Sequence, residues 1–509
     1  MSWLIGLVVL VALAAVALAG VSSYGRLARR ASGQPAHALA VGDDETAIDR
    51  LVAPLLRGRD GQSGVVLLAD NLQAFALRAA SARQAGRSLD LQYYYWLDDL
   101  TGGLLLREVI AAADRGVRVR MLIDDISMRG RNRLYRAVDT HPHIEIRLFN
   151  PSRNRSNGFK RGFELLARFV TATRRMHNKA WITDGRIAII GGRNIGDAYF
   201  DADADSNFHD MDLALVGEAL APAQAIFDEF WNSAVAVPIE ALFRRRLRLT
   251  LADVRARHET LAAQPRAEPY LARLEEPSAE AALPPRDTLR WIDEVEVLSD
   301  KARKALGANN GNRLATRIGD LVASARRDLA IISPYFIPGD DGMAVLDRLI
   351  ARGVRISVLT NSLAATDVVA VHGAYAGYRR PLLKLGVALY ELRPELTPAR
   401  GSLFGSKGAS LHTKAFTVDG ETAFVGSFNF DPRSRSLNTE MGIIVHDREL
   451  ACEIDRHFRE QTQPDSAYAV TLRDGRLRWG EGSGREPGAS LRRRLAAFLI
   501  GCLPVESQL

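Results

Sequence analysis

The sequence contains little cysteine and only a mild excess of one charge, and both features narrow its class. Its 509 residues include two cysteines, Cys452 and Cys502, which excludes a disulfide framework and a cysteine-ligated zinc site. Lysine and arginine total 67 against 60 for aspartate and glutamate, so the net charge is only +7. That excess permits an anionic partner, phospholipid or nucleic acid, without choosing between them. The hydrophobic share of 47% is typical of a globular protein and excludes a disordered, collagen-like or coiled-coil chain.

An apolar run without any charged residue extends over residues 3–21. Lysine and arginine are absent from positions 1–5, at its start. An uncharged run of this length can cross a bilayer as a helix. Residues 17–19 (Ala-Leu-Ala) would fit a signal-peptide cleavage site, but the basic segment that precedes such a run is missing. Arginines follow the run instead, so the positive-inside rule favours an anchor at residues 1–24 with the body on the cytoplasmic face. A signal segment is the alternative.

The carboxyl end combines basic and apolar residues. Three arginines at positions 492–494 precede Leu495, Phe498 and Leu499. Residues 469–509 are therefore interpreted as a basic amphipathic tail that suits a membrane surface with anionic lipid. A terminal helix docked on the core is an equal alternative.

The body of the chain is an internal repeat. In each half a strand, a helix and a second strand follow one another, with strands expected at residues 88–96 and 117–123, and again at 328–336 and 354–359. The helices end at Gly116 and Gly353, which lie 237 residues apart. This pattern predicts an α/β fold of two halves, at 40–239 and 291–468, each with a largely parallel sheet. The polar, proline-containing stretch at 240–290 is expected to be a linker.

A second marker repeats at nearly the same offset. The pattern His-x-Lys-x4-Asp-x6-Gly-x2-Asn occurs at 177–194 and again at 412–429, 235 residues apart. Average residue usage gives this pattern by chance in roughly one chain of this length in ten thousand. Its residues are His177, Lys179, Asp184 and Asn194 in the first copy, and His412, Lys414, Asp419 and Asn429 in the second.

The spacing of the motif places its polar groups together. Alternate residues of a strand share one face, so the histidine and lysine of each copy point the same way. A turn after the aspartate returns the chain and brings the asparagine near them. Two halves related by a pseudo-two-fold axis would thus place two imidazoles, two ammonium groups and two amides around one point. These donors suit a phosphoryl centre.

Two imidazoles in one site suit a two-step displacement. One attacks phosphorus and forms a phosphohistidine, while the other protonates the leaving alkoxide and then deprotonates the incoming alcohol or water. The lysines offset the developing charge, so no metal or other cofactor is expected. A nucleophilic histidine needs an acceptor for its other ring nitrogen. The candidates are Asp210 and Glu440, each just before a strand of its half, with Asp212 as an alternative in the first half.

These motifs resemble the paired motifs of the phospholipase D superfamily over roughly residues 60–465. The flanking residues at 174–179, 191–200, 360–367 and 427–434 are similar to those of bacterial cardiolipin synthases, specifically the C-type branch. The resemblance implies two α/β/α sandwich halves with one shared active site, a covalent phosphatidyl-histidine and no metal. Two departures stand out. Gly192 occupies the position of Ser427 in the second copy, and a single anchor is expected where some cardiolipin synthases have two spanning helices.

The resemblance also implies individual roles. His177 would be the nucleophile and His412 the general acid and base. Both lysines, Asn194 and Asn429 would hold the phosphoryl oxygens. Asp184 and Asp419 would be structural and pair with nearby basic groups.

The expected function is that of a phosphatidyltransferase that makes cardiolipin at the bacterial inner membrane. Its expected partners are phospholipid substrates, namely phosphatidylglycerol and possibly phosphatidylethanolamine, and the membrane surface. A hydrolytic phospholipase D is the nearest alternative, because water competes with the acceptor lipid. A nuclease of the same superfamily is a further alternative, and the anchor argues against it, so no nucleic acid partner is expected. A lipid-binding scaffold with a dead site is disfavoured because both motifs are intact.

Overall fold

The computed structural model describes residues 33–508, except 43, 129–130, 153–163, 165–172, 244–247, 275–278, 285, 309–310, 395–407, 481, 483–485 and 503–507. Within these residues, no helix combines the length and the apolar character that crossing a membrane requires. The predicted anchor at residues 1–24 lies outside the described part of the chain.

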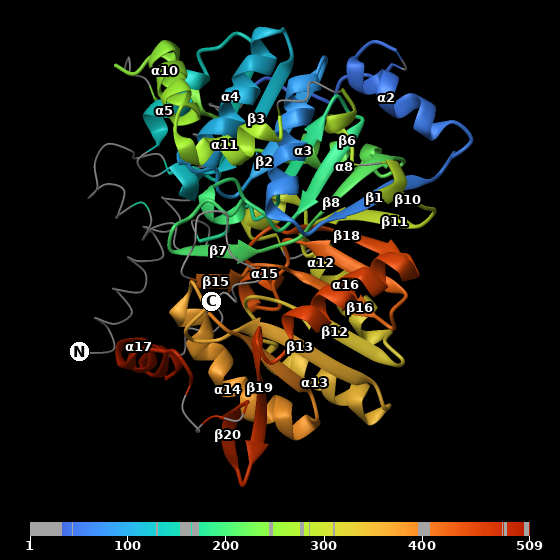
Figure 1. Ribbon diagram of the computed structural model, residues 1–509, viewed down its shortest axis with the longest axis vertical. Helices are drawn as coiled ribbons and strands as arrows, with labels where there is room; N and C mark the ends of the chain where they lie inside the picture. The colour runs from blue at the N-terminus through green and yellow to red at the C-terminus, as the bar shows by residue number, and fades with distance from the viewer. Residues whose placement is uncertain are drawn as a thin grey trace, which may run out of the picture.

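Two nine-stranded sheets form the frame of the molecule, one above the other in Figure 1. The first sheet has the order β10-β1-β8-β6-β5-β2-β3-β4-β9 and the second β11-β18-β17-β16-β12-β13-β14-β19-β20. The strands of the first are β1 (Ser63–Leu68), β2 (Ser88–Tyr93), β3 (Arg118–Asp124), β4 (Ile144–Phe149), β5 (Ala180–Thr183), β6 (Ile187–Gly191), β8 (Asp212–Gly217), β9 (Ala236–Pro238) and β10 (Arg290–Ile292). Those of the second are β11 (Val295–Ser299), β12 (Asp328–Ile332), β13 (Arg355–Asn361), β14 (Ala388–Leu392), β16 (Ala415–Val418), β17 (Thr422–Gly426), β18 (Met441–His446), β19 (Ala467–Arg473) and β20 (Arg476–Trp479). From β1 to β9 and from β11 to β19 the two orders correspond strand by strand, so the predicted fold of two α/β halves is confirmed.

The prediction of largely parallel sheets is wrong. Only β2-β3-β4 and β12-β13-β14 run parallel, and the neighbouring pairs are antiparallel. The reason is the chain after each motif. Asp184 and Asp419 adopt left-handed backbone conformations, with φ of 53° and 57°, and the following turns close the hairpins β5-β6 and β16-β17. Helical crossovers therefore set the direction of only three strands in each half.

Glycines end the helices of both crossovers. Helix α4 (Leu100–Asp114) stops before Gly116, and α13 (Gly339–Ala351) stops before Gly353. The two glycines have φ of 93° and 85°, a left-handed conformation that other residues rarely adopt. After each glycine the chain enters a largely buried strand, β3 in the first half and β13 in the second. The carboxyl ends of these strands lie at the end of the sheet where the motifs lie.

The halves share a continuous core. Apolar residues of β1, β5 and β8 in the first sheet pack with residues of β16, β17 and β18 in the second, together with helices α8 (Leu220–Trp231) and α16 (Arg448–Gln461). The outer face of the first sheet is covered by α3 (Asn71–Gln84) and α4, and that of the second by α12 (Arg313–Ala323), α13 and α14 (Val369–Leu385). Since one core joins the sheets, the relative position of the halves is fixed by packing.

The segments outside the two predicted halves are folded where they are described. In the linker at 240–290, α10 (Leu251–Ala262) packs on α4, and α11 (Glu268–Ala272) contacts α3. In the tail at 469–509, β19 continues and β20 pairs with it at the edge of the second sheet, and α17 (Leu491–Gly501) packs on α14. A short parallel pair, β7 (Ser206–His209) with β15 (Gly408–Leu411), joins the halves directly.

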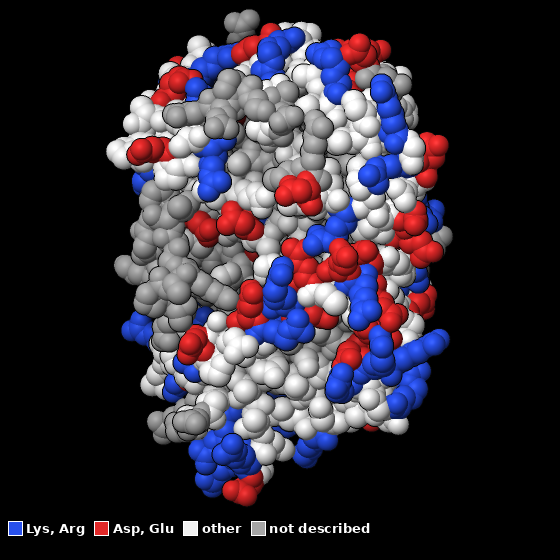
Figure 2. All heavy atoms as spheres, turned by 45° about the vertical axis from the view of Figure 1, so that its right-hand side comes forward, with Lys and Arg blue, Asp and Glu red and all other residues white. Residues whose placement is uncertain are grey.

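Charge is mixed on the surface. Figure 2 shows acidic and basic side chains interleaved on one face, with acidic ones gathered at mid-height, where the halves meet in Figure 1. This face therefore presents no continuous basic surface.

Candidate active site

The two motifs meet where the halves join. His177 and Lys179 lie in an extended segment just before β5, and His412 and Lys414 lie just before β16. The sequence predicted these residues within strands, whereas they precede them. The reason is that their backbones pair across the halves. The backbone N–H of His177 donates to Thr439 (2.8 Å), and that of His412 donates to His209 (2.8 Å).

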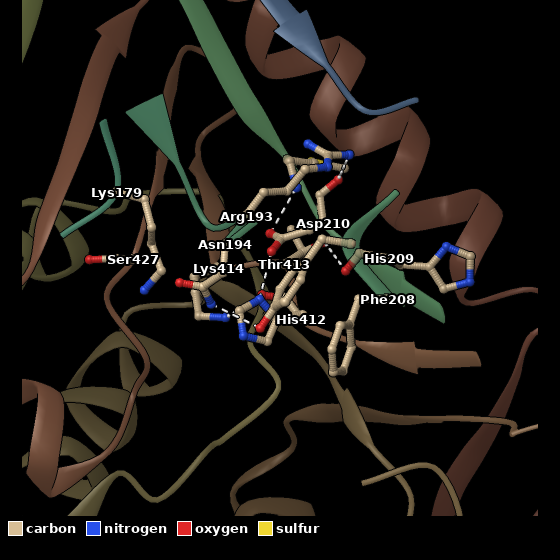
Figure 3. A network of polar contacts seen from close by, with 12 residues as sticks. Lys179, Arg193, Asn194, Phe208, His209, Asp210, His412, Thr413, Lys414 and Ser427 are labelled. Carbon is tan, nitrogen blue, oxygen red and sulfur yellow. Dashed lines mark hydrogen bonds and ion pairs between the residues drawn. The ribbon is translucent and has the colours of Figure 1, made fainter. Parts of the chain in front are cut away.

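Each imidazole is held by a carboxylate of the other half. Nδ1 of His177 lies 2.8 Å from Oε2 of Glu440, and Nδ1 of His412 lies 2.6 Å from Oδ2 of Asp210. Figure 3 shows the second of these pairs. With Nδ1 engaged, Nε2 of each ring is the nitrogen available for chemistry. Asp212, the alternative acceptor, instead pairs with two buried arginines, Arg78 (2.8 Å) and Arg193 (3.1 Å).

The two lysines lie beside the imidazoles. Nζ of Lys179 donates to the carbonyl of His177 (2.5 Å), and Nζ of Lys414 lies 3.0 Å from Nδ1 of His412. In Figure 3 the side chains of Lys179, Lys414 and His412 point toward one another, whereas the ring of His209 points away. The site therefore joins two ammonium groups and two imidazoles from both halves.

The two asparagines differ. Oδ1 of Asn194 accepts from the backbone N–H of Tyr95 (3.0 Å), and its Nδ2 donates to the hydroxyl of Tyr199 (2.8 Å). Oδ1 of Asn429 is buried without a hydrogen-bond partner among the described residues. The amide of Asn429 is therefore the less constrained of the two toward a bound phosphoryl group.

The motif aspartates lie at the other end of their strands. The Asp184 carboxylate accepts from the backbone N–H groups of Gly86, Arg87 and Ser88 at 2.8–2.9 Å. Asp419 accepts in the same way from residues 326–328. Their partners are thus mainly backbone amides, rather than the basic side chains that the sequence suggested, and both aspartates bind the start of a neighbouring strand.

Gly192 makes room for the carboxylate that holds His412. A Cβ atom built on Gly192 would lie 2.2 Å from Oδ1 of Asp210. In the second half, Ser427 stands at this position and its hydroxyl donates to Glu440. The shorter aspartate is therefore paired with glycine and the longer glutamate with serine, which explains the departure between the two copies of the motif.

Burial controls the charge of the site. His177 is 8% exposed, and burial lowers its pKa to about 4, helped by the positive charges of Lys179 and Lys414 and opposed by Glu440. Burial and then the charges of both lysines and of His177 lower the pKa of His412 well below its ordinary value. Nδ1 of His177 also lies 3.0 Å from the carbonyl oxygen of Ser427, and the neighbouring Gly426 donates to the carbonyl of Lys414, so the two copies of the motif meet in one site.

The lysine ammonium groups are also destabilised. Burial lowers the pKa of Lys414 to about 8, although Asp210 and other carboxylates oppose the shift. Burial lowers the pKa of Lys179 well below its usual value as well. Burial raises the pKa of Asp210, against the charges of Lys414 and Arg193. An anion that enters between these groups would favour their protonated forms.

The sequence interpretation assigned no role to Ser434 or Tyr199 of the site. The Ser434 hydroxyl donates to Oε1 of Glu440 (2.8 Å), so this carboxylate accepts from two serines as well as facing an imidazole. The ring of Tyr94 contacts His177 edge-on at 5.1 Å between centroids, and Tyr199 contacts His412 at 5.2 Å. The aromatic residues at 93–96 of the sequence were compatible with either a substrate channel or core packing, but no spacing rule identified Ser434.

Among the residues that the structure describes, no three or more histidine, cysteine, aspartate or glutamate side chains are grouped as a metal site would require.

Comparison with known families places most of both halves in one family. Residues 80–231 and 318–462 match the family described as "Cardiolipin synthase, PLD-like domain". These two matched segments contain both copies of the motif.

Individual proteins are similar over most of their length. The chain is 39% identical over 478 residues to cardiolipin synthase C of Escherichia coli strain K12, which covers 89% of this chain and 98% of that protein. It is 27% identical over 421 residues to cardiolipin synthase B of the same strain, with 82% of each chain covered. Among solved structures, phosphatidylserine synthase of Haemophilus influenzae Rd KW20 covers 90% of this chain at a TM-score of 0.55 and 14% identity. At that identity the likeness shows the shared fold.

Proposed function

The chain belongs to the family of cardiolipin synthases with phospholipase D-like domains, and from this premise we propose that it makes cardiolipin by transferring a phosphatidyl group between phospholipids. One observation carries the proposal. Two imidazoles from different halves share a buried site with two lysines, and each ring is held at Nδ1 by a carboxylate. This arrangement leaves two Nε2 atoms to act on one phosphodiester.

The first step forms the covalent intermediate. Nε2 of His177 attacks the phosphorus of the donor lipid, the new P–N bond forms, and the P–O bond to the headgroup breaks. His412 donates its Nε2 proton to the departing alkoxide, which leaves as a neutral alcohol. The lysine ammonium groups offset the charge that builds on the non-bridging oxygens. The resemblance to the superfamily supports His177 as the nucleophile.

The second step reverses the first with a new alcohol. Nε2 of His412, now unprotonated, takes the proton of a phosphatidylglycerol hydroxyl as its oxygen attacks phosphorus. The P–N bond breaks and His177 is regenerated. Glu440 and Asp210 orient the rings and stabilise each imidazolium as it forms. Because the site is almost completely buried, a seated acceptor lipid would exclude competing water.

A product assay tests the proposed function. The full chain is given vesicles of phosphatidylglycerol alone, or of phosphatidylglycerol with phosphatidylethanolamine. Cardiolipin with an equal amount of released glycerol or ethanolamine is the expected result, and the released alcohol identifies the donor. Phosphatidic acid as the main product in both vesicles would contradict transfer and indicate hydrolysis.

Trapping tests the nucleophile. Acid quenching during turnover of a donor labelled in its phosphatidyl group should leave label on the wild-type chain and none on His177→Asn. The matched variant His412→Asn keeps the proposed nucleophile and is expected to retain label when the donor carries an activated leaving group. Label on His177→Asn would overturn the assignment.

A further inference from the structure

The terminal helix α17 exposes an apolar stripe. Its exposed residues Leu491, Leu495, Phe498 and Leu499 recur at i, i+4, i+7 and i+8, which places them on one face of a helix. Their exposed fractions run from 55% to 80%. Half of the large apolar residues that are exposed in the described part of the chain lie on this helix, and Val368, next to the start of α14, is another. Such a concentration marks an interaction surface.

The opposite face of α17 is already packed. The backbone of Ala497 lies against Gly373 of α14, where an added Cβ would be only 2.5 Å from the Ala497 carbonyl oxygen. Arg493 donates through Nε to the carbonyl of Leu363 (3.0 Å) and through Nη2 to that of Thr366. The helix is thus fixed to the second half, and its apolar stripe faces away from the core that holds it.

The charge of the helix selects an anionic partner. Residues 491–501 include three arginines and no acid. At 3.6 residues per turn, Arg492 and Arg494 lie on either side of the apolar stripe. Arg493 and Arg494 donate to backbone carbonyls. Neither these two nor Arg492 forms an ion pair with a described carboxylate. An apolar stripe between uncompensated arginines matches a lipid surface with negative headgroups.

The helix also lies close to the candidate active site. The segment from Leu363 to Thr366, which Arg493 holds, leads directly into Asp367. Asp367 accepts from the hydroxyl of Tyr335 (2.9 Å), and Asn361, two residues before Leu363, forms two hydrogen bonds (2.9 Å) with the backbone of Leu411, the residue before His412. Figure 1 shows α17 on the same side of the molecule as β7 and β15, which precede Asp210 and His412.

We propose that α17 is an interfacial helix that inserts its apolar stripe into an anionic lipid surface and so brings the side of the molecule that carries β7 and β15 against the headgroups. This surface is separate from the catalytic residues and goes beyond the proposed transfer reaction. Its occupant is a membrane leaflet that contains phosphatidylglycerol. The apolar run at residues 3–21 of the same chain, or a protein partner, would be the competing occupants.

Fluorescence at position 498 tests the insertion. In the full chain with Cys452 and Cys502 replaced by serine, Phe498→Cys carries an environment-sensitive fluorophore. Reconstitution into vesicles that contain phosphatidylglycerol should shift its emission to the blue and allow quenching by nitroxide-labelled lipids. Vesicles of phosphatidylcholine alone should give a weaker response. The control Glu421→Cys lies in the β16-β17 turn, at the far end of the strand from Lys414, and should not respond.

The other outcomes overturn the proposal. A blue-shifted emission that is the same in both vesicles and insensitive to nitroxide lipids would mean that protein covers the stripe. An unshifted emission in both would mean that the stripe stays in water. Replacing Arg492 or Arg494 with alanine should weaken the lipid-dependent response about fivefold each, as one arginine near an anionic surface contributes. An unchanged response would contradict the electrostatic part.

A kinetic test separates this proposal from the proposed function. The double variant Leu495→Ser, Phe498→Ser should lose at least about tenfold of the rate on phosphatidylglycerol vesicles and keep the rate on monomeric short-chain phosphatidylglycerol. The matched control Val41→Ser changes an exposed apolar residue beside Gly185 in the first half, whereas α17 packs on α14 of the second half, and it should keep both rates. Equal losses on both substrates would overturn docking by α17. A wild-type chain inactive on both would refute the transfer reaction, while the fluorescence would still decide the docking.

Discussion

At the scale of single residues, the two carboxylates that hold the imidazoles are stabilised unequally. Glu440 accepts from the hydroxyls of Ser427 and Ser434 besides facing His177. Asp210 accepts from the backbone N–H of Met211 (2.9 Å) and faces His412. The position of Asp210 therefore depends more on the space around it than on its hydrogen bonds.

Gly192 provides that space, so a single methyl group should be damaging. Gly192→Ala would place Cβ 2.2 Å from Oδ1 of Asp210, and the carboxylate would have to move away from His412. A displacement of about 1 Å in such a site costs roughly 100-fold in rate, which steady-state kinetics would measure. The control Gly319→Ala lies in α12 with no atom within 4 Å of the new methyl and should retain activity. Full activity of Gly192→Ala would refute the positioning role of Asp210.

The protonation of His412 should change when an anion binds. In the free site, burial and the lysine charges lower the pKa of His412 well below 6.5. A doubly charged oxyanion between the lysines would raise that pKa, so near pH 6.5 His412 should take up a proton on binding, and any uptake by Lys179 or His177 would add to it. Calorimetry of sulfate binding in buffers of different ionisation enthalpy measures this uptake. At that pH Lys414, with a pKa of about 8, is already mostly protonated.

The variant His412→Asn assigns the proton. It keeps both lysines for anion binding, so sulfate should still bind while the proton uptake falls. The same uptake in His412→Asn and wild type would show that another group takes the proton.

At the scale of elements, the motif aspartates hold each hairpin, β5-β6 or β16-β17, to the start of the neighbouring strand, β2 or β12. Asp184 is fully buried and accepts from three backbone N–H groups before and at the start of β2. Asp184→Ala would leave these donors unpaired, at a cost of about 2 kcal/mol or more of folding free energy. Asp419→Ala should cost less because its partners lie nearer solvent. Thermal unfolding midpoints would measure both.

Activity distinguishes this structural role from a catalytic one. Protein of either variant that remains folded should retain most of its turnover rate, since neither carboxylate touches an imidazole or lysine of the site. A normal unfolding midpoint with a large loss of rate would contradict the assignment.

At the scale of the whole molecule, the repeat in the sequence determined most of what could be predicted. Gly116 and Gly353, with the motif offset, identified two β-α-β units and the residues that meet between them. Strand direction outside those units could not be inferred, because hairpins and long connections set it. The crossed pairing of Glu440 with His177 and of Asp210 with His412 was equally hidden. Each of these two carboxylates precedes a strand of its own half in the sequence. Only the packing of one sheet on the other brings it to the histidine of the other half.

The crossed pairing makes the site a property of one complete chain. Both imidazoles and both carboxylates belong to the same molecule, and one hydrophobic core joins its halves. A mixture of His177→Asn and His412→Asn proteins therefore contains no intact site, and its activity should stay at or below about 10⁻³ of the wild-type rate. A mixture of either variant with wild type is the control. Its activity should be proportional to the fraction of wild-type protein that it contains. Recovery of a substantial rate in the mixture of variants would mean that halves of different chains pair, which would refute a site formed within one chain.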